Sequence, residues 1–215
     1  MLTPGHSRIR SSHLFIAWLL VCTGLLSACT DSAPRLPRLA ENAVILAFGD
    51  SITHGNGAQE NKSYPAVLSR LTGHPVINAG VPGEVSAQGR ERLPALLDRQ
   101  RPDLLILCHG GNDFLRRINV DITRSNIEAM IEAAAQRNIP VILIGVPNLG
   151  LFFLDSAEFY SEIADKYKLA YEGDILPDVE SDTALKSDQI HPNAAGYQRI
   201  AEAIDKLMTE SGALP

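Results

Sequence analysis

The chain has 215 residues, of which 45% are hydrophobic and 20% are charged, and its formal net charge is −6. This length fits one domain of ordinary size, and the balance of apolar and charged residues excludes an intrinsically disordered protein. The acidic charge, without a basic stripe in the sequence, argues against nucleic acid as a partner.

The first 28 residues are expected to be a leader that is not part of the fold. Arg8 and Arg10 precede an apolar run over residues 14–26, which is shorter than the roughly 20 residues of a membrane-spanning helix. The run ends in Leu26-Ser27-Ala28-Cys29, which resembles the cleavage box of bacterial lipoproteins. This box predicts cleavage before Cys29 and a lipid anchor on its thiol. An ordinary secretory signal or an uncleaved anchor is the alternative.

Residues 29–42 are expected to form the lipidated cysteine and a tether. Pro34 and Pro37 lie in this segment, which shows no helical or strand periodicity. Thr30 follows Cys29 where an aspartate would favour retention at the inner membrane. We therefore expect a location in the cell envelope, on the periplasmic side of the outer membrane if the source has one.

Residues 43–215 are expected to form the folded domain, in which short apolar runs alternate with helical patterns. Strands are predicted over residues 44–48, 76–78, 104–108 and 141–146 and, more weakly, over 169–175. Helices are predicted over residues 64–71, 86–99, 127–134 and 159–167, and after an N-cap at Asn193. The strands are apolar throughout, as in parallel sheets that are buried on both faces. The sequence therefore predicts a three-layer α/β domain with a mainly parallel sheet.

Polar residues follow the ends of the predicted strands, where parallel sheets bind their ligands. Ser51 follows the first strand, and a serine hydroxyl becomes a good nucleophile only beside a base. Asp188 and His191 precede the last helix, and Pro192 keeps His191 in an extended backbone, outside that helix. Such an Asp-x-x-His loop can orient an imidazole toward a serine. The plainer alternatives are a serine that only caps a helix and an ion pair within a loop.

Gly80 and Asn112 follow the second and third strands and are candidate donors for an oxyanion hole. A backbone N–H or a side-chain amide aimed at the developing negative charge contributes about 2.7–4 kcal/mol each. The alternative is ordinary turn chemistry, in which both residue types are common. Cys108 ends an apolar run and is expected to be a small buried hydrophobe, and with Cys29 lipidated no disulfide is available.

Together, and in this order, these blocks resemble the GDSL or SGNH hydrolases. The matching residues are Gly49-Asp50-Ser51 with Gly55, then Gly80, then Gly110-Gly111-Asn112-Asp113, and finally Asp188-Gln189-Ile190-His191. The resemblance implies a flavodoxin-like α/β/α fold with a five-stranded sheet in the order 2-1-3-4-5. It implies Ser51 as nucleophile, His191 as general base and Asp188 as the residue that orients His191. It also implies an oxyanion hole from the N–H groups of Ser51 and Gly80 and the side chain of Asn112, with no metal or cofactor.

The members that the chain resembles are secreted arylesterases, acyl-thioesterases and lysophospholipases. This implies hydrolysis of carboxylic esters or thioesters through an acyl-Ser51 intermediate, with a small acyl ester or a lysophospholipid as substrate and a monomeric chain. The apolar residues 149–154 are expected either to line an acyl pocket or to pack on the core. Arg116 and Arg117 would meet an anionic headgroup or remain solvated.

Two other functions stay open at this point. The first is a carbohydrate O-acetylesterase, because the family that the chain resembles includes carbohydrate esterases. The second is a non-catalytic binding lipoprotein on the same fold, because a fold does not fix a function.

Overall fold

The computed structural model describes Met1 and residues 35–147 and 156–215. The predicted leader, Cys29 and the apolar residues 149–154 lie outside the described residues. Residues 33–215 belong to one compact unit, and the description below concerns that unit.

Five short apolar segments form one parallel sheet at the centre of the unit. Its strands are β1 (Ile45–Gly49), β2 (Val76–Gly80), β3 (Leu104–Cys108), β4 (Val141–Ile144) and β5 (Ala170–Glu172). They lie in the order β2-β1-β3-β4-β5, and every neighbouring pair is parallel. Every residue of β1, β3 and β4 is buried, which explains why these strands are apolar without alternation. The predicted fold class and strand order are confirmed.

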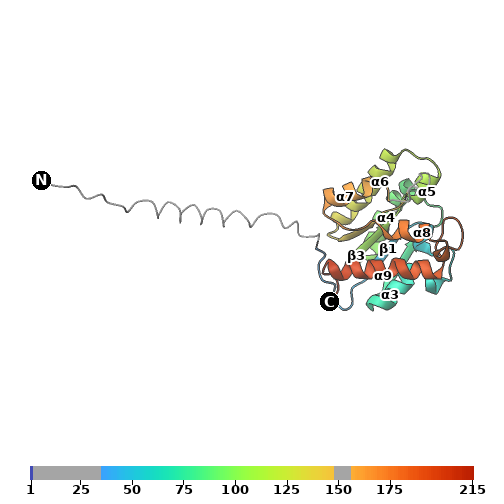
Figure 1. Ribbon diagram of the computed structural model, residues 1–215, viewed down its shortest axis with the longest axis horizontal. Helices are drawn as coiled ribbons and strands as arrows, with labels where there is room; N and C mark the ends of the chain where they lie inside the picture. The colour runs from blue at the N-terminus through green and yellow to red at the C-terminus, as the bar shows by residue number, and fades with distance from the viewer. Residues whose placement is uncertain (2–34, 148–155) are drawn as a thin grey trace. The chain divides into compact units, whose positions relative to one another are not determined.

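Helices cover both faces of this sheet (Figure 1). The α-helices are α2 (Ser51–His54), α3 (Tyr64–Thr72), α4 (Ser86–Gln100), α5 (Gly111–Leu115), α6 (Val120–Ala135), α7 (Phe159–Tyr167), α8 (Ile175–Ser181) and α9 (Ala194–Glu210), and the short 3-10 helices are η1 (Glu60–Lys62) and η2 (Thr183–Leu185). Helices α3 and α9 pack together on one face, and α4, α6 and α7 cover the other. The result is a three-layer α/β/α unit.

Helix ends follow local signals that are visible in the sequence. Gly73 ends α3 in the left-handed conformation, and Asn193 caps α9 by accepting hydrogen bonds from the N–H groups of Ala195 and Gly196. Helix α9 buries Tyr197, Ile200, Ala201 and Ile204, whose spacing in the sequence is that of one helix face.

Several elements differ from the sequence prediction, and one of them is α6, which begins at Val120 and not at residue 127. The fifth strand ends at Glu172, and Ile175 begins helix α8, because Glu172 Oε1 accepts hydrogen bonds from the N–H groups of Asp174 and Ile175. Helices α2 and α5 are single turns directly after β1 and β3, too short to show a periodicity.

The expected tether is in part folded. The N–H of Leu36 donates to Ser211 O and that of Leu39 to Ala213 O, at 2.9 and 3.0 Å. Both leucine side chains pack against the core. The domain therefore begins before residue 43, because the C-terminal segment supplies hydrogen-bond partners that the local sequence does not reveal.

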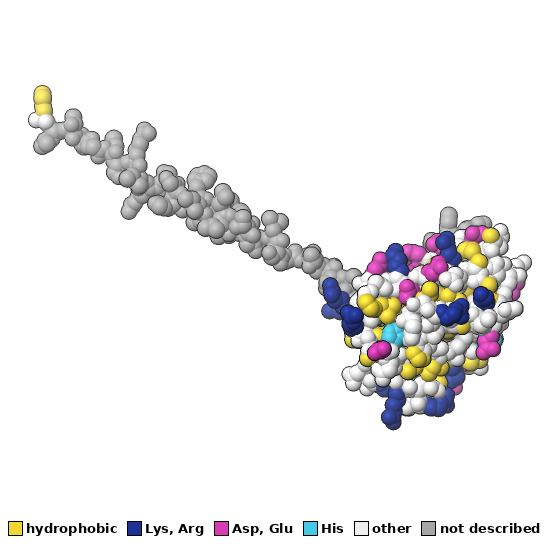
Figure 2. Space-filling view, turned by 90° about the horizontal axis from the view of Figure 1, so that it is seen from below, with side chains coloured by type: hydrophobic (Ala, Val, Ile, Leu, Met, Phe, Trp, Pro, Cys, Tyr) yellow, Lys and Arg dark blue, Asp and Glu magenta, His cyan; other side chains and the backbone are white. Residues whose placement is uncertain are grey.

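The surface of this unit carries mixed charge. On the face seen in Figure 2, acidic and basic side chains are interspersed with small apolar patches. Within residues 35–147 and 156–215, no helix combines the length and the apolarity needed to cross a membrane.

Candidate active site

Ser51 lies at the sharp turn between β1 and α2. The preceding residue, Asp50, caps α2 by accepting a hydrogen bond from the N–H of Ile52 at 3.1 Å. The helix ends after four residues at Gly55, whose φ of 101° favours glycine. This turn places Ser51 at the C-terminal edge of the sheet, and no described residue accepts a hydrogen bond from its backbone N–H.

A tight loop before α9 holds Asp188 and His191 together. Asp188 Oδ1 accepts hydrogen bonds from the backbone N–H groups of Ile190 and His191, both at 2.8 Å. The Nδ1–H of His191 donates to Asp188 Oδ2, also at 2.8 Å. The three hydrogen bonds, led by those from His191, lower the pKa of Asp188 to about 2. The carboxylate therefore stays ionised and fixes the imidazole tautomer that leaves Nε2 as an acceptor.

The side chain of Asn193 ties this loop to the fold. Its amide donates to the carbonyls of Ala184 and Lys186 at 2.8 and 3.1 Å. Its oxygen caps α9, so one side chain fixes both the loop and the helix that follows.

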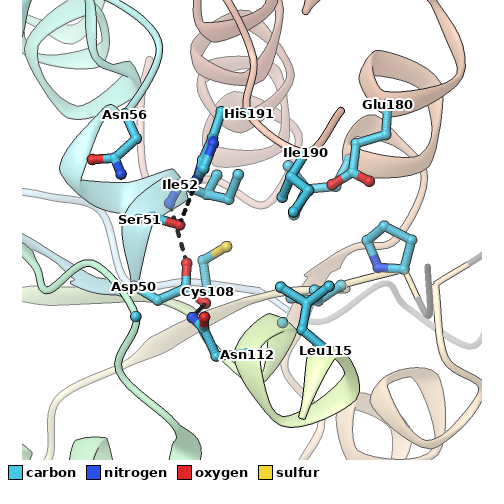
Figure 3. A pocket seen from close by; sticks show the side chains of 15 residues that line it. Asp50, Ser51, Ile52, Asn56, Cys108, Asn112, Leu115, Glu180, Ile190 and His191 are labelled. Carbon is cyan, nitrogen blue, oxygen red and sulfur yellow. Dashed lines mark hydrogen bonds between the residues drawn. The ribbon is translucent and has the colours of Figure 1, made fainter. Parts of the chain in front are cut away.

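Ser51 and His191, 140 residues apart in sequence, meet in space. The hydroxyl of Ser51 lies 3.1 Å from Nε2 of His191 (Figure 3). The other described histidines have different surroundings: His54 bonds to Asn56, His74 is buried, and His109 is buried against Glu84. The Asp188–His191–Ser51 line has the hydrogen-bond pattern of a nucleophile, a base and an orienting acid.

Asn112 lies in the first turn of α5 and is held by the residue before Ser51. Its Nδ2 donates to Asp50 Oδ2 at 3.1 Å, which leaves the second amide hydrogen free of any described partner. Asp50 is 4% exposed, and burial raises the pKa of its carboxyl. The same carboxyl thus fixes the start of α2 and the amide of Asn112.

Gly80 does not lie where the sequence prediction put it. It is the last residue of β2, its N–H donates to Asn78 Oδ1 at 3.0 Å, and it lines a separate depression beside His54. A Cβ at Gly80 would lie 2.1 Å from the backbone nitrogen of His54. Gly80 is therefore required for close packing of β2 against α2, and the prediction of an oxyanion-hole role for it was wrong.

Gly83 occupies the position that was predicted for Gly80. It lines the pocket with Ser51 and Asn112, and no described residue accepts a hydrogen bond from its N–H. Its φ of 76° is a conformation that favours glycine. The Pro82-Gly83 pair just after the strand was the turn signal that could have identified it.

Two contacts hold the loop that carries Gly83. The guanidinium of Arg116, an exposed residue, donates to Gly83 O at 2.7 Å, so one of its nitrogens holds this loop. The next residue, Glu84, accepts two hydrogen bonds from Arg92, at 2.8 and 2.7 Å, and one from His109 at 3.1 Å. Burial alone would raise the pKa of Glu84, but hydrogen bonds from His109 and Arg92 lower it to about 2. None of these partners was found from the sequence.

The pocket beside Ser51 has a volume of about 290 Å³. Away from Ser51 and His191 most of its wall is apolar, formed by Ile52, Leu115, Val146, Pro147, Leu176 and Ile190. Cys108 lies at its floor, and burial raises the pKa of this thiol well above its usual range, so it stays protonated. The exception in the apolar wall is Glu180 of α8, which the sequence prediction missed.

Metal ligands are not grouped in the described part of the chain: no three His, Cys, Asp or Glu side chains there are placed to hold an ion. The side chains of Ser51 and His191 are placed for proton transfer between them.

Comparisons with known proteins agree with this arrangement. The chain matches the model of the GDSL-like Lipase/Acylhydrolase family over residues 47–199. It is 30% identical to Esterase TesA of Pseudomonas aeruginosa over 84% of this chain and 94% of that protein. It is 28% identical to Thioesterase 1/protease 1/lysophospholipase L1 of Escherichia coli over 80% of this chain and 86% of that protein. A crystal structure of TesA superposes with a TM-score of 0.68 and 28% identity, covering 78% of this chain and 99% of its own.

Proposed function

This chain belongs to the GDSL-like lipase/acylhydrolase family and is a serine ester hydrolase, and we propose that Ser51 is its nucleophile. The observation that supports this proposal is the 3.1 Å separation of Ser51 Oγ and His191 Nε2. With His191 Nδ1 bonded to the Asp188 carboxylate at 2.8 Å, Nε2 is the basic nitrogen that faces the hydroxyl.

The reaction proceeds in two acyl transfers. In the first, His191 Nε2 takes the Ser51 proton while Oγ attacks the carbonyl carbon, and Asp188 stabilises the imidazolium that results. The tetrahedral intermediate collapses, His191 donates the proton to the leaving alcohol or thiol, and an acyl-Ser51 ester remains. In the second, His191 takes a proton from water, which attacks the acyl carbon, and returns it to Ser51.

The negative oxygen of both intermediates needs hydrogen-bond donors. We assign this role to the backbone N–H groups of Ser51 and Gly83 and to the side-chain amide of Asn112. All three residues line one pocket, and no described residue accepts a hydrogen bond from either backbone N–H. Asp50 and Arg116 hold Asn112 and the Gly83 loop in place, so the donors are preorganised.

The substrates proposed are carboxylic esters or thioesters of small or single-chain acyl groups. The names of the relatives, an esterase and a thioesterase/lysophospholipase, support this class. The mostly apolar wall beside Ser51 supports an acyl or alkyl group as one part of the substrate. A lysophospholipid is the substrate that a membrane anchor would favour.

The test is hydrolysis of p-nitrophenyl esters from acetyl to palmitoyl by the full-length chain purified in detergent. Wild type is expected to hydrolyse at least one ester and to be labelled by a fluorophosphonate, while Ser51→Ala loses both properties. Ser161→Ala, on α7 and bonded only to a backbone carbonyl of its own helix turn, is the matched control. If a folded wild-type sample neither hydrolyses any ester nor takes the label, the nucleophile assignment fails and the binding-protein alternative replaces it.

We further propose that Cys29 is lipidated and that the domain is held at a membrane of the cell envelope as a monomer. The small residues Ser27 and Ala28 before Cys29 support this proposal. Radiolabelled palmitate supplied to expressing bacteria is expected to label wild type and Cys22→Ser but not Cys29→Ser. Labelling that persists in Cys29→Ser would contradict the anchor.

A further inference from the structure

Glu180 lies in the last turn of α8 and lines the same pocket as Ser51 and His191. The residue is 5% exposed. Its Oε2 atom is buried and has no hydrogen-bond partner among the described residues. Figure 3 shows its carboxyl extending from α8 to a place beside Ile190.

The surroundings of this carboxyl do not compensate its burial. Ile190 of the pocket wall lies beside it (Figure 3), and α8 otherwise buries Leu176, Pro177 and Val179. Two charged groups act on it at longer range: Lys186 favours its ionised form, and Asp50 opposes it. Burial dominates and raises the pKa of Glu180 to about 7. A buried polar group without a partner is unfavourable, and native structures contain few of them.

Packing does not require an acid at this position. A leucine would continue the apolar series of α8, and a plain alkyl chain would then be surrounded by apolar side chains only. The acid makes that end of the pocket a poor environment for a plain alkyl chain, because the chain would seal the carboxyl from water without offering it a hydrogen bond.

We propose that Glu180 is a specificity-determining residue that binds a hydrogen-bond donor, most directly a hydroxyl group, on the part of the substrate that enters this pocket. The inference rests on the proposed esterase function and narrows it to hydroxylated acyl or alcohol groups. A hydroxyl group suits both forms of the acid, because it donates to the carboxylate and can also accept from the carboxylic acid. An ammonium group suits only the ionised form, because it donates hydrogen bonds and accepts none. It is the alternative donor that the experiment tests against the hydroxyl group.

The experiment compares three esters of the same chain length: p-nitrophenyl butyrate, its 3-hydroxy derivative and its 4-amino derivative. The enzymes are the full-length wild type, Glu180→Gln, Glu180→Leu and the matched control Asp178→Asn, an exposed acid of the same helix. Each is assayed between pH 5.5 and 8.5. The readout is the ratio of kcat/KM for the hydroxy ester to kcat/KM for the plain ester. The ratio isolates the effect of the hydroxyl group, because both esters require the same nucleophile and base.

Glu180→Leu is expected to lower the ratio by about tenfold, the equivalent of one lost hydrogen bond. Glu180→Gln, which keeps a donor and an acceptor, is expected to stay within about threefold of wild type and to lose the dependence of the ratio on pH. Asp178→Asn is expected to keep both the ratio and its pH dependence. Melting curves in each buffer confirm that the variants are folded.

Three outcomes would overturn the inference. Equal ratios for wild type and Glu180→Leu exclude recognition by the carboxyl. A wild-type preference for the amino ester replaces the hydroxyl assignment with an ammonium site. Inactivity of folded wild type on all three esters, together with no fluorophosphonate labelling, would overturn the proposed function and this inference with it.

Discussion

The two sides of the pocket are built in opposite ways. On the side of Ser51, the side chains assigned to catalysis are held by neighbours: His191 is held by Asp188, and Asn112 by Asp50. On the side of α8, the Oε2 atom of Glu180 is buried and has no hydrogen-bond partner in the part of the chain that the structure describes. The first side is ordered before a substrate arrives, as acyl transfer requires, because donors that are already oriented need no reorganisation during the reaction. The second side leaves its polar group for the substrate to satisfy.

The largest effect is expected from removing the nucleophile or its base. Ser51→Ala and His191→Ala should each lower kcat by about 10⁴-fold or more, because each abolishes the acyl-enzyme route. The double variant should lose no more than either single variant, because the two side chains act as one unit. Steady-state kinetics with melting curves measures this, and additive losses in the double variant would contradict a joint role.

The next largest effect concerns the oxyanion. Asn112→Ala should lower kcat by about 10²–10³-fold with little change in KM, because the amide acts on charge that exists only in the transition state. A rise in KM of the same size, with kcat unchanged, would instead assign Asn112 to substrate binding. Asn126→Ala removes a buried asparagine that bonds to Ser86 outside the pocket, and it should leave kcat within a fewfold of wild type.

A smaller effect is expected from the residue that holds the Gly83 loop. Arg116→Ala should lower kcat by about three- to tenfold, since an exposed hydrogen bond from a charged group contributes little more than about 1 kcal/mol. Arg99→Ala, an exposed arginine on α4 without a described hydrogen bond, is the control. A normal kcat in Arg116→Ala would show that the loop is held by Glu84 and Arg92 without it.

The smallest effect is on stability and comes from the other side of the pocket. The pKa of Glu180 is raised to about 7 in the fold, so the folded state binds this proton more tightly than the unfolded state. Its contribution to stability is therefore lost as the pH rises from the unfolded pKa toward 7. Glu180→Gln should be more stable than wild type at pH 8 by about 1 kcal/mol, a rise in Tm of about 2–4 °C, and the gain should disappear at pH 4.5. A gain in Tm that is equal at pH 8 and at pH 4.5 would contradict this account, in which burial of the ionised Glu180 carboxyl destabilises the fold.

The pKa of Asp188 is shifted in the opposite direction to that of Glu180, so its effect on stability depends on pH in the opposite way. The pKa of Asp188 is lowered to about 2. Its stabilising contribution is therefore present when the pH is above the usual pKa of an aspartate, and it is lost as the pH falls toward 2. Asp188→Asn should therefore lower Tm at pH 7, and the difference should shrink below pH 3. A difference in Tm that is constant with pH would show that the hydrogen bonds to the ionised Asp188 carboxylate do not stabilise the fold.

Much of the fold was predictable because it depends on neighbours in sequence. The apolar runs of β1, β3 and β4 indicated buried parallel strands, and Gly73 and Asn193 indicated helix ends. Burial pattern and capping involve residues a few positions apart, so they are visible without a structure. Short elements such as α2, α5 and α8 escaped prediction, because one or two turns show no periodicity.

Within the site, the residues that sequence reasoning identified are those that occur in short blocks at strand ends. Ser51, Asn112, Asp188 and His191 are brought to one pocket, as the topology of a parallel sheet requires. Gly80 was chosen over Gly83 because the sequence does not say how far β2 extends: pairing with β1 carries the strand through Gly80 and leaves the turn to the next residues.

The sequence by itself therefore determined the layers, the order of the chemistry along the chain and the family of the fold. The tertiary structure alone decided which glycine faces Ser51, that Arg116 holds its loop, that residues 36–39 pair with the C-terminal segment, and that Glu180 faces the pocket. The first group rests on local hydrogen bonding and on the burial period of each element. The second rests on contacts between residues tens or hundreds of positions apart, such as Arg116 with Gly83 and Leu36 with Ser211, and no local pattern encodes those partners.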